Sequence, residues 1–376
     1  MYINDIDTPK YLSVKSHILD AIRNGELKYN EKLMSRSKME EFYNVSASTI
    51  NKALEELSYE GYIYKIKGKG TFVTKRKASY ANKVIALIIP LNSNPTKTDI
   101  SPFLTSSIAI GVRDTEYNLM VFDSLDEIKS LDEAVRQEVA GIIMMSYFPT
   151  NQDHAINAMK QIIESGTPIV MIDRIIDNME TGFVSTDHFR GAYYAIKSLI
   201  DDGFTKIYHF SSKEKNSAIM QRRFGYSQAM LSADLNPEVF FVDTLSDSGY
   251  PEYENKFYEA LLETKEILDE KCAIFTTNGD GLRGIWKAVV EHNLLYKELA
   301  LATFDNPDII LPSHVKFVNV IQHLDQIGYD AVHMIIDMIN DNAKDLNCII
   351  NPRIYKNHED ITEKCNEIYK DSVHLR

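Results

Sequence analysis

The sequence predicts an α/β protein in two parts: a small helical module closed by a β-hairpin, followed by a larger doubly wound domain. Apolar residues within the first ~75 positions recur in three blocks at helical spacing, before a β-rich run with a Gly-Lys-Gly turn. From residue 84 onward, short apolar runs alternate with helical patterns, which is typical of parallel sheets covered by helices. Charge is divided in the same way, since residues 1–77 hold 14 Lys+Arg against 10 Asp+Glu, whereas the rest is strongly acidic.

Length and composition limit the class of protein. A chain of 376 residues with 44% hydrophobic and 25% charged residues is long enough for two or three domains with full cores. Its three cysteines form no CxxC pair and no metal-ligand spacing with histidine, so we expect a reducing cytoplasm and no metal site. The acidic N-terminus lacks an apolar core, and no apolar run reaches the ~20 residues of a membrane span, so neither a signal peptide nor a membrane partner is expected.

The first two helices of the module are marked by their start and stop signals. Pro9 suits the first turn of a helix that residues 24–25, Asn-Gly, should end. The apolar stripe of this helix is Tyr11, Val14, Ile18, Ala21 and Ile22. The capping-box pattern of residues 37–40 predicts a second helix, with Met39 and Phe42 facing inward.

A third helix and a hairpin complete the module. Ser46 is a good N-cap, and Gly61 is a good stop. The inward face between them is expected to hold Ile50, Ala53, Leu54 and Leu57. Residues 62–67 and 71–74 then predict two strands joined by the turn at 68–70.

This order of elements is that of a winged helix-turn-helix, whose third helix enters the major groove of double-stranded DNA. The third helix would present small or polar side chains to base edges, and the hairpin would present cations to phosphates. From Lys65 to Lys77 there are six cations and no acid. The alternative is a small helical domain with a solvated basic hairpin, which the ordered set of features disfavours. The predicted DNA-binding residues are Ser35, Ser37, Ala47, Ser48, Thr49, Asn51, Lys52, Lys67 and Lys69.

These segments resemble the GntR family of bacterial regulators from about Tyr11 to Val73. The resemblance rests on residues 22–27, 45–50, 53–57, 60–63 and 68–73. It implies binding of operator DNA as a symmetric dimer.

The chain departs from the GntR pattern at positions that commonly touch DNA. The family usually has Leu-Pro-Ser where this chain has Leu33-Met34-Ser35, and it often has arginine where this chain has Ser37, Ala47 and Asn51. Asparagine can pair with adenine, whereas a missing arginine removes a reader of guanine. We therefore expect an operator that differs from the commonest type in the family, which binding selection would test.

The second part begins with the continuous apolar run 84–89, which suits a buried parallel strand. Further strands are predicted at Leu119–Phe122, Gly141–Met145, Ile169–Ile172, Phe183–Ser185, Lys206–Phe210, Val239–Val242, Ala273–Thr276 and Leu299–Phe304. Ligands bind at the carboxyl ends of such strands.

Polar residues gather where these strands end. They are Ser146, Asp173-Arg174, Thr186-Asp187, Ser211-Ser212, Asn278 and Asp305-Asn306. A monosaccharide needs this mixture of hydroxyl, amide, carboxylate and guanidinium groups, because each sugar hydroxyl both donates and accepts hydrogen bonds. Phe103 could pack on an apolar sugar face. For Asp187 and Ser211 taken alone, a loop cap or structural bond is the favoured interpretation.

This part resembles the LacI-type effector domain, which shares its fold with periplasmic sugar-binding proteins, from about Lys83 to Tyr355. The resemblance rests on residues 101–103, 166–174, 184–187, 222–226, 277–278, 303–306 and 321–322. It implies that positions matching Asp173, Arg222, Asn278, Asp305 and Gln322 hold the effector. With the neighbouring Arg174 and the aromatic Phe103 they form the predicted effector site. The family's Asn-Asp pair is Asn278-Gly279 here, and the acid comes only at Asp280.

The predicted division is a winged helix domain at 1–76, a linker at 77–82, an effector domain at 83–360 and a C-terminal tail at 361–376. The fold implied by the resemblance has two lobes joined by three crossovers. Lobe one is expected at about 83–186 and 306–323, and lobe two at about 187–305 and 324–360. A homodimer is expected because both families bind two half-sites.

The expected function is a DNA-binding regulator, a repressor of a sugar-utilisation operon whose operator affinity changes when a small-molecule effector binds. The combination resembles arabinose-repressor-type regulators, so arabinose or a related sugar such as fucose is the first effector to try. A sugar phosphate clamped by Arg174 and Arg222 is the alternative, as is a non-sugar effector. Fusion to a PLP-dependent enzyme would need a longer chain and a cofactor lysine, and no Walker phosphate loop, HExxH or GxSxG motif occurs, so neither enzymatic activity nor a cofactor is expected.

Overall fold

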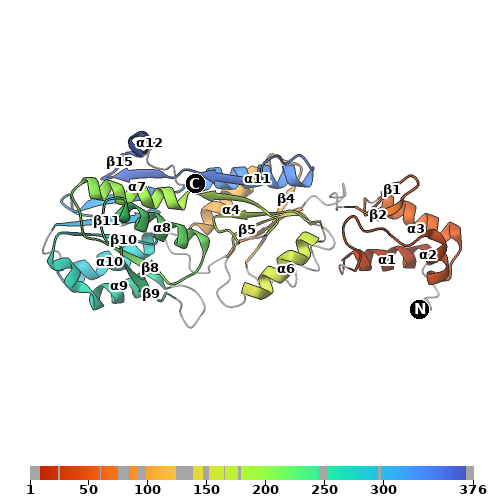
Figure 1. Cartoon of the computed structure of the whole chain (residues 1–376), viewed down its shortest axis with the longest axis horizontal. Helices are drawn as coiled ribbons and strands as arrows, with labels where there is room; N and C mark the ends of the chain where they lie inside the picture. Colours follow the sequence, from red (N-terminus) through yellow and green to blue (C-terminus); the bar gives the residue numbers. More distant parts are fainter. Residues whose placement is uncertain are drawn as a thin grey trace.

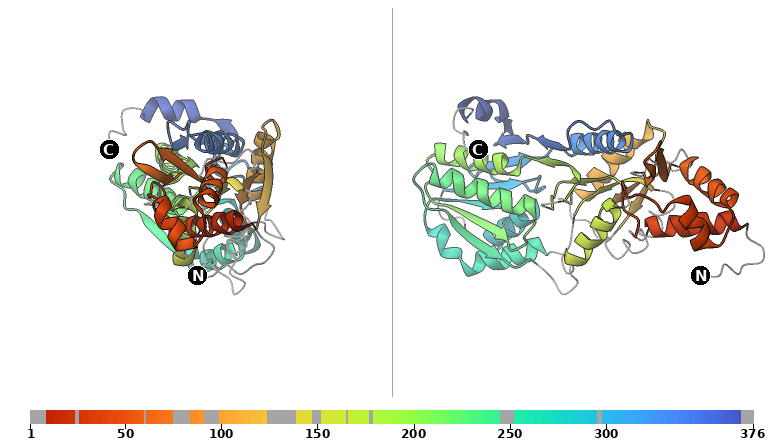
Figure 2. Two further views of the ribbon diagram at one scale, coloured as in Figure 1. Left: turned by 90° about the vertical axis from the view of Figure 1, so that its right-hand side faces the viewer. Right: turned by 45° about the vertical axis from the view of Figure 1, so that its right-hand side comes forward.

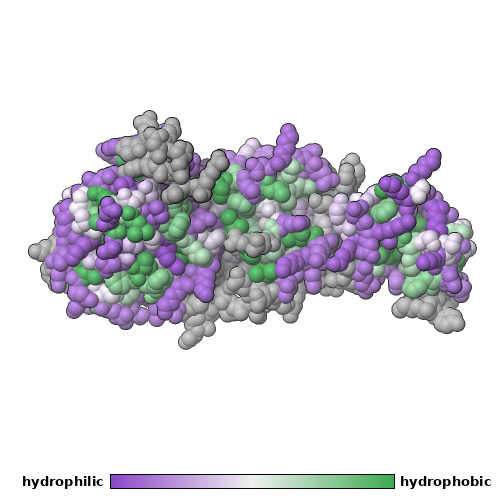
Figure 3. All heavy atoms as spheres, in the orientation of Figure 1, coloured by the Kyte–Doolittle hydropathy of each residue, from purple (hydrophilic) through white to green (hydrophobic). Residues whose placement is uncertain are grey.

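The computed structural model shows an elongated molecule, with a small helical domain at one end and two α/β lobes beyond it (Figure 1). It describes residues 9–23, 26–59, 61–74, 84–90, 99–123, 139–146, 152–164, 166–176, 179–244, 252–294 and 298–369. The predicted linker and the stop signal at 24–25 lie outside these residues. On the face drawn in Figure 3, apolar residues form scattered patches among hydrophilic ones. None of the described helices is both long and apolar enough to cross a membrane.

The N-terminal domain has the predicted order of elements, which are α1 (Lys10–Arg23), α2 (Arg36–Tyr43), α3 (Ala47–Tyr59), β1 (Ile63–Ile66) and β2 (Gly70–Val73). The strands pair antiparallel around the Gly-Lys-Gly turn, as expected. Val14, Ile50 and Leu57 are fully buried in the core that the three helices share. This confirms the winged helix-turn-helix architecture.

Two details of α2 differ from expectation. The N-cap is Ser35, whose hydroxyl accepts a hydrogen bond from the Lys38 amide, so Ser37 lies within the first turn and does not cap the helix. Phe42 is 52% exposed, and Tyr43 is buried in its place. Met39 and Tyr43 are four residues apart and share one helix face, whereas Phe42 is turned about 100° from Tyr43.

Lobe one is built on a six-stranded sheet in the order β13-β7-β6-β5-β3-β4. All of its neighbouring strands are parallel. Its strands are β3 (Val84–Ile88), β4 (Asn118–Phe122), β5 (Val139–Met144), β6 (Ile169–Ile172), β7 (Gly182–Thr186) and β13 (Asn347–Ile350). Its helices are α4 (Ser101–Arg113), α6 (Gln152–Glu164) and α11 (Leu324–Ile339). The apolar runs predicted as strands are therefore buried between helices, as a doubly wound fold requires.

Lobe two is built on a seven-stranded sheet in the order β15-β14-β12-β11-β10-β8-β9. Its strands are β8 (Ile207–Ser212), β9 (Glu238–Val242), β10 (Cys272–Thr276), β11 (Leu299–Phe304), β12 (Lys316–Ile321), β14 (Arg353–Lys356) and β15 (Glu359–Asp360). Its helices are α7 (His188–Asp201), α8 (Ser217–Leu231), α9 (Tyr253–Glu263), α10 (Gly279–Glu291), α12 (Thr362–Tyr369) and the 3-10 turn η1 (Lys265–Asp269). The antiparallel pairs are those that β14 makes with β12 and β15.

The expected division of the lobes is wrong for the C-terminal segments. Residues 316–321, expected in lobe one, form β12 and pair with β11 of lobe two, where Val318 and Val320 are fully buried. Residues 324–339, expected in lobe two, form α11, which packs on α4 in the core of lobe one. The chain nevertheless crosses between lobes three times, after β7, after β12 and after β13, as predicted.

Part of the predicted tail is a folded element of lobe two. Residues 362–369 form α12, and Cys365 is buried in the core of that lobe. Thr362 accepts a hydrogen bond from the Ile354 amide through its hydroxyl, which ties the start of α12 to β14. Figure 2 shows α12 at the end of the molecule opposite the winged helix domain.

Candidate functional site

Asp173 and Asp305 both stand directly after a buried strand, at the carboxyl ends of β6 and β11. Each has a φ of +63°, a left-handed conformation that Asp tolerates better than bulky residues do. Both side chains are largely buried. Gln322 directly follows β12, so parallel strands from two sheets deliver polar groups to the space between the lobes.

Arg222 is the centre of this site. It lies on α8 and is only 6% exposed. Its Nη1 donates a 2.8 Å hydrogen bond to the Thr277 carbonyl oxygen and lies 4.0 Å from Oδ2 of Asp305. The guanidinium carbon lies 4.0 Å from the centre of the Phe304 ring, which adds a cation–π contact. The guanidinium is therefore held in one orientation by protein groups alone.

His188 links Arg222 to Asp173. Its Nδ1 lies 3.3 Å from Nε and 3.2 Å from Nη2 of Arg222, and its Nε2 lies 3.4 Å from Oδ1 of Asp173. Burial and the Arg222 charge lower the pKa of His188, so the imidazole is neutral. A neutral ring that accepts at Nδ1 carries its proton on Nε2, where it faces the Asp173 carboxylate.

Close helix packing makes the contact between His188 and Arg222 possible. His188 begins α7, and Gly225 lies one turn beyond Arg222 on α8. A Cβ atom at Gly225 would lie 2.3 Å from the carbonyl oxygen of Phe189, a distance that real Cβ atoms essentially never show. Glycine at this position therefore lets α8 approach the start of α7.

A second chain of hydrogen bonds crosses the hinge. The Thr186 hydroxyl donates to Oε1 of Gln322 at 2.8 Å, and Nε2 of Gln322 donates to Oδ1 of Asp305 at 3.0 Å. Thr186 ends β7 of lobe one, whereas Asp305 follows β11 of lobe two. The two lobes are therefore joined by side chains as well as by the three crossing segments.

The two buried aspartates differ in their protonation equilibria. Burial acts to raise the pKa of Asp173, but His188 together with the charges of Arg174 and Arg222 outweighs it and lowers the pKa to about 2. Burial raises the pKa of Asp305, and Arg222 and Gln322 offset this only in part. Asp173 is therefore ionised at neutral pH, whereas ionising Asp305 costs more free energy than ionising an exposed aspartate.

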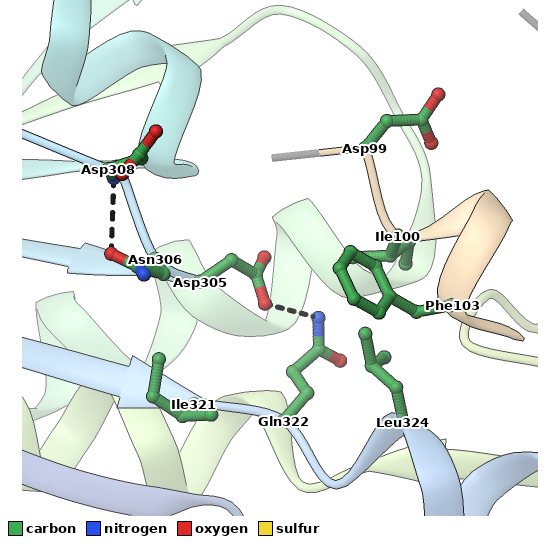
Figure 4. A pocket seen from close by; sticks show the side chains of 9 residues that line it. All are labelled: Asp99, Ile100, Phe103, Asp305, Asn306, Asp308, Ile321, Gln322 and Leu324. Atoms are coloured by element: carbon green, nitrogen blue, oxygen red, sulfur yellow. Dashed lines mark hydrogen bonds between the residues drawn. The ribbon is translucent and has the colours of Figure 1, made fainter. Parts of the chain in front are cut away.

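An open cavity of about 510 Å³ lies beside these residues, between the lobes (Figure 4). Ile100, Phe103 and Leu324 of lobe one form an apolar side, and Asp305, Asn306 and Asp308 line it from lobe two. Phe103 is 62% exposed, so one face of its ring is free for a ligand. This cavity has an aromatic ring on one side, and its other lining residues include carboxylates and side-chain amides. Such a lining suits a polyhydroxylated ring, because the ring offers an apolar face for stacking and hydroxyl groups for hydrogen bonds.

The structure connects five of the seven predicted effector residues in one group and places a sixth, Phe103, at the cavity that two of them line. Arg222, Asp173 and Arg174 form one connected group, with Nε of Arg174 lying 3.4 Å from Oδ2 of Asp173. Asp305 and Gln322 join this group through Arg222 and also line the cavity, as Phe103 does. Asn278 instead caps α10, its side-chain oxygen accepting the Gly281 amide at 3.0 Å.

Sequence reasoning missed His188, Thr277 and Phe304. His188 directly follows the polar pair Thr186-Asp187 at the end of a predicted strand, a position from which it could have been found. Thr277 takes part through its carbonyl oxygen, and Phe304 through its ring face. Neither property is visible in a residue type.

Most of the residues proposed to touch DNA lie on the surface of the winged helix domain. Ser35, Ser37, Ala47, Ser48, Lys52, Lys67 and Lys69 are exposed, whereas Thr49 and Asn51 are half-buried. Oγ of Ser46, the predicted cap of α3, lies 3.4 Å from the Thr49 amide and 2.9 Å from the Thr49 hydroxyl. The Asn51 side-chain oxygen is enclosed without a hydrogen-bond partner, so its amide must turn outward to read a base. Lys52 places its ammonium 3.9 Å from the centre of the Tyr11 ring.

Family comparisons match both parts of the chain. Residues 10–73 match the family described as bacterial regulatory proteins, gntR family. Residues 120–344, more than half of the chain, match the periplasmic binding protein domain family. Within the described residues, no group of three or more His, Cys, Asp or Glu side chains is placed to hold a metal ion.

Two curated relatives align with almost the whole chain. The arabinose metabolism transcriptional repressor of Halalkalibacterium halodurans is 25% identical over 89% of this chain and 91% of its own length. The repressor of the same name from Geobacillus stearothermophilus is 24% identical over 90% of this chain and 93% of its own length.

Solved structures share the fold. A periplasmic binding protein/LacI transcriptional regulator from Alkaliphilus metalliredigens, complexed with D-xylulofuranose, covers 75% of this chain and 99% of its own, with 22% identity and a TM-score of 0.57. The transcriptional regulator CelR in complex with cellobiose covers 93% of this chain and 99% of its own, with 15% identity and a TM-score of 0.60. The chain therefore belongs to the periplasmic binding protein domain family, and it joins that domain to an N-terminal DNA-binding domain of the gntR family of bacterial transcription regulators.

Proposed function

We propose that this protein is a cytoplasmic repressor of a sugar-utilisation operon, which binds operator DNA as a homodimer and changes its operator affinity when a monosaccharide binds between the lobes. The observation that carries the proposal is the connected group Asp173, His188, Arg222, Asp305 and Gln322 beside the cavity that Phe103 lines. Sugar-binding sites need such fixed donors and acceptors, together with an aromatic face.

The charges favour a neutral sugar over a sugar phosphate. The described lining of the cavity includes Asp99, Asp305 and Asp308 and no cation. Arg174 lies against Asp173, and Arg222 lies between His188 and Asp305, so both guanidinium groups already face protein acids or acceptors. A phosphate at this cavity would have to approach three carboxylates, which repel it.

Arabinose is the first effector to test, because two relatives that align over most of this chain are named arabinose metabolism repressors. Thermal unfolding of the full chain should be followed with L-arabinose, D-fucose, D-xylose, D-xylulose and fructose 1-phosphate. A sugar that binds the folded state raises the unfolding temperature by mass action. Stabilisation by fructose 1-phosphate alone would contradict the neutral-sugar proposal.

Arg222→Ala tests whether the site is the one described. Because the Arg222 guanidinium orients His188 and Asp305 and does not itself line the cavity, its removal should misplace Asp305 and weaken sugar binding by about tenfold or more. Arg113→Ala is the matched control, since Arg113 is exposed on lobe one and pairs only locally with Asp114. Calorimetric titration of both folded variants gives the comparison, and undiminished binding by the Arg222 variant would remove this residue from the site.

Regulation requires that sugar and operator binding be coupled. An effector that weakens operator binding must itself bind less tightly to the operator complex, by the same factor. Operator affinity measured with and without the stabilising sugar tests this, and equal affinities would refute the proposed regulation. Sedimentation of the free protein and of its operator complex tests the homodimer.

A further inference from the structure

A second cavity, of about 750 Å³, lies at the base of lobe one. Its lining includes Ala140 at the start of β5, Pro168 before β6, Thr181 before β7 and Asn347 at the start of β13. These positions mark the amino ends of the strands, the edge of the sheet opposite the carboxyl ends where Asp173 and the hinge residue Thr186 lie. This cavity is therefore separate from the proposed sugar site.

Tyr29 of the winged helix domain also lines this cavity. It lies in the loop between α1 and α2, and Figure 1 places the end of α1 that leads into this loop on the side of lobe one. Among the described lining residues, Tyr29 alone comes from the winged helix domain. The ring is 55% exposed, so its contact with the lobe is partial and can be made or broken without unfolding either part.

Residues 26–35, called the Tyr29 loop here, are hydrogen-bonded to the hairpin that is expected to touch DNA. The Asn30 amide donates to the Val73 carbonyl at 3.0 Å, and the Leu33 amide donates to the Thr71 carbonyl at 2.9 Å. In return, the Val73 amide donates to the Glu31 carbonyl at 2.9 Å. A displacement of Tyr29 must therefore move β2, and with β2 the turn that carries Lys67 and Lys69.

Three elements of lobe one connect the two cavities. Strand β6 runs from just after Pro168 to just before Asp173, and β7 runs from just after Thr181 to Thr186. Helix α11 begins at Leu324, which lines the sugar cavity, and ends at Ile339, which lines the basal one. Its 16 residues span about 24 Å. Helix α11 thus has one end at each cavity, whereas β6 and β7 run from the basal cavity to Asp173 and to Thr186, which bonds the cavity residue Gln322.

We infer that the basal cavity is a docking surface for the Tyr29 loop, and that this contact transmits the state of the effector lobes to the DNA-binding hairpin. The apolar part of the surface, which includes Met179, Met338 and Leu346, suits the tyrosine ring. The exposed acids Glu164, Glu180 and Asp341 at the same surface complement the exposed Lys28 and Lys32 that flank Tyr29. Strain or rotation within lobe one on sugar binding would then reach the hairpin through packed elements.

The docking itself is tested without any ligand. Hydrogen exchange of the full chain should be compared for wild type, Tyr29→Ala and Tyr59→Ala. Tyr59 is a matched control, because it is a tyrosine of the same domain that is 94% exposed and does not line the cavity. Exchange in residues 338–347 should rise several-fold in the Tyr29 variant and stay unchanged in the Tyr59 variant. Equal exchange in all three proteins would overturn the docking surface.

The transmission is tested from both sides of the contact, and this test rests on the proposed function. Operator affinity should be measured with and without L-arabinose or another sugar of the panel that stabilises the wild type. An effect of about tenfold in the wild type should fall to about twofold or less in Tyr29→Ala and in Ala343→Trp, which fills the cavity. Tyr29→Phe and Lys344→Trp, an exposed neighbour outside the cavity, should keep the full effect.

The outcomes separate the two proposals. If no sugar changes operator affinity in the wild type, the proposed function fails, and the exchange experiment still decides the docking surface. If the wild type responds and the Tyr29 and Ala343 variants respond equally, the transmission fails while the function stands. Sugar affinity should remain within about twofold of wild type in all four variants in the absence of DNA, since none of the substituted residues lines the sugar cavity.

Discussion

The Thr186 hydroxyl donates a hydrogen bond of 2.8 Å to the side-chain oxygen of Gln322, and so joins two of the three segments that cross between the lobes. Both residues are buried, with exposed fractions of 1% and 5%. Gln322 in turn donates a hydrogen bond to Asp305, which lines the cavity between the lobes. The single amide of Gln322 therefore links a residue of this cavity to a residue of the hinge.

Thr186→Val should loosen this link. Valine has the shape of threonine but leaves the Gln322 oxygen buried without a donor, which costs about 1–3 kcal/mol of unfolding free energy. Thr105→Val is the control, because the Thr105 hydroxyl donates to the Ser101 carbonyl within one helix of one lobe. Denaturant unfolding and sugar titration should show lower stability and several-fold weaker sugar binding for the Thr186 variant only. Unaltered sugar affinity would show that the hinge bond does not position Gln322.

Asp173→Asn should destabilise the free protein at neutral pH. The pKa of Asp173 lies at about 2 in the folded protein, below its ordinary value of 3.8, so its ionised form stabilises the fold. This stabilisation is fully present at pH values above the ordinary pKa of 3.8 and is lost as the pH falls toward about 2. The pKa difference corresponds to about 2 kcal/mol of unfolding free energy. Unfolding free energies of the two proteins should therefore differ at pH 7 and converge only as the pH falls to about 2. An equal difference at both pH values would contradict the assigned role.

Asp305→Asn should have the opposite effect on stability. Because burial raises the pKa of Asp305, the stability contributed by its protonated form is lost as the pH rises through that raised pKa. Asparagine keeps an acceptor for Gln322 and tolerates the left-handed backbone, so the free variant should be as stable as wild type at pH 7 or more so. Sugar binding should weaken at least tenfold, because a charged acceptor becomes neutral. Thermal unfolding checks the expected stability, and calorimetric titration checks the expected loss of sugar affinity. A strongly destabilised variant would contradict the prediction.

Lys67→Ala and Lys69→Ala should weaken operator binding through loss of phosphate contacts. Each substitution should lower the slope of log affinity against log salt by about 1, and should weaken different operator sequences to a similar degree. Lys364→Ala, at an exposed lysine of α12 in lobe two, is the control. A change in sequence preference, with an unchanged salt slope, would place these lysines at bases instead of phosphates.

Much of the fold could be predicted because local signals and burial agree. In α3, the cap at Ser46 and the stripe from Ile50 to Leu57 predicted both the start of the helix and its buried face. Asp173 and Asp305 could be predicted to follow buried strands because the apolar runs of β6 and β11 end directly before them, and ligands bind at such strand ends in parallel sheets. In these segments the local sequence signals and the burial in the folded protein favour the same secondary structure.

The remaining features depend on contacts that are distant in sequence. Strand β12 belongs to lobe two because it pairs with β11, and its sequence holds no information about which sheet it joins. Phe42 and Tyr43 are both aromatic, so only the exact start of α2 decides which of them is buried. The role inferred for Tyr29 depends on a cavity formed by residues more than a hundred positions away.

The three crossings also determine the order in which the protein can fold as it is synthesised. The winged helix domain is complete once residue 73 has left the ribosome, whereas lobe one still lacks α11 and β13 until residue 350 has been added. At 5–20 residues per second, this interval lasts on the order of tens of seconds. During that time a nascent chain carries a complete winged helix domain but an incomplete lobe one. The winged helix domain can therefore fold before the lobe that is proposed to regulate it has been synthesised.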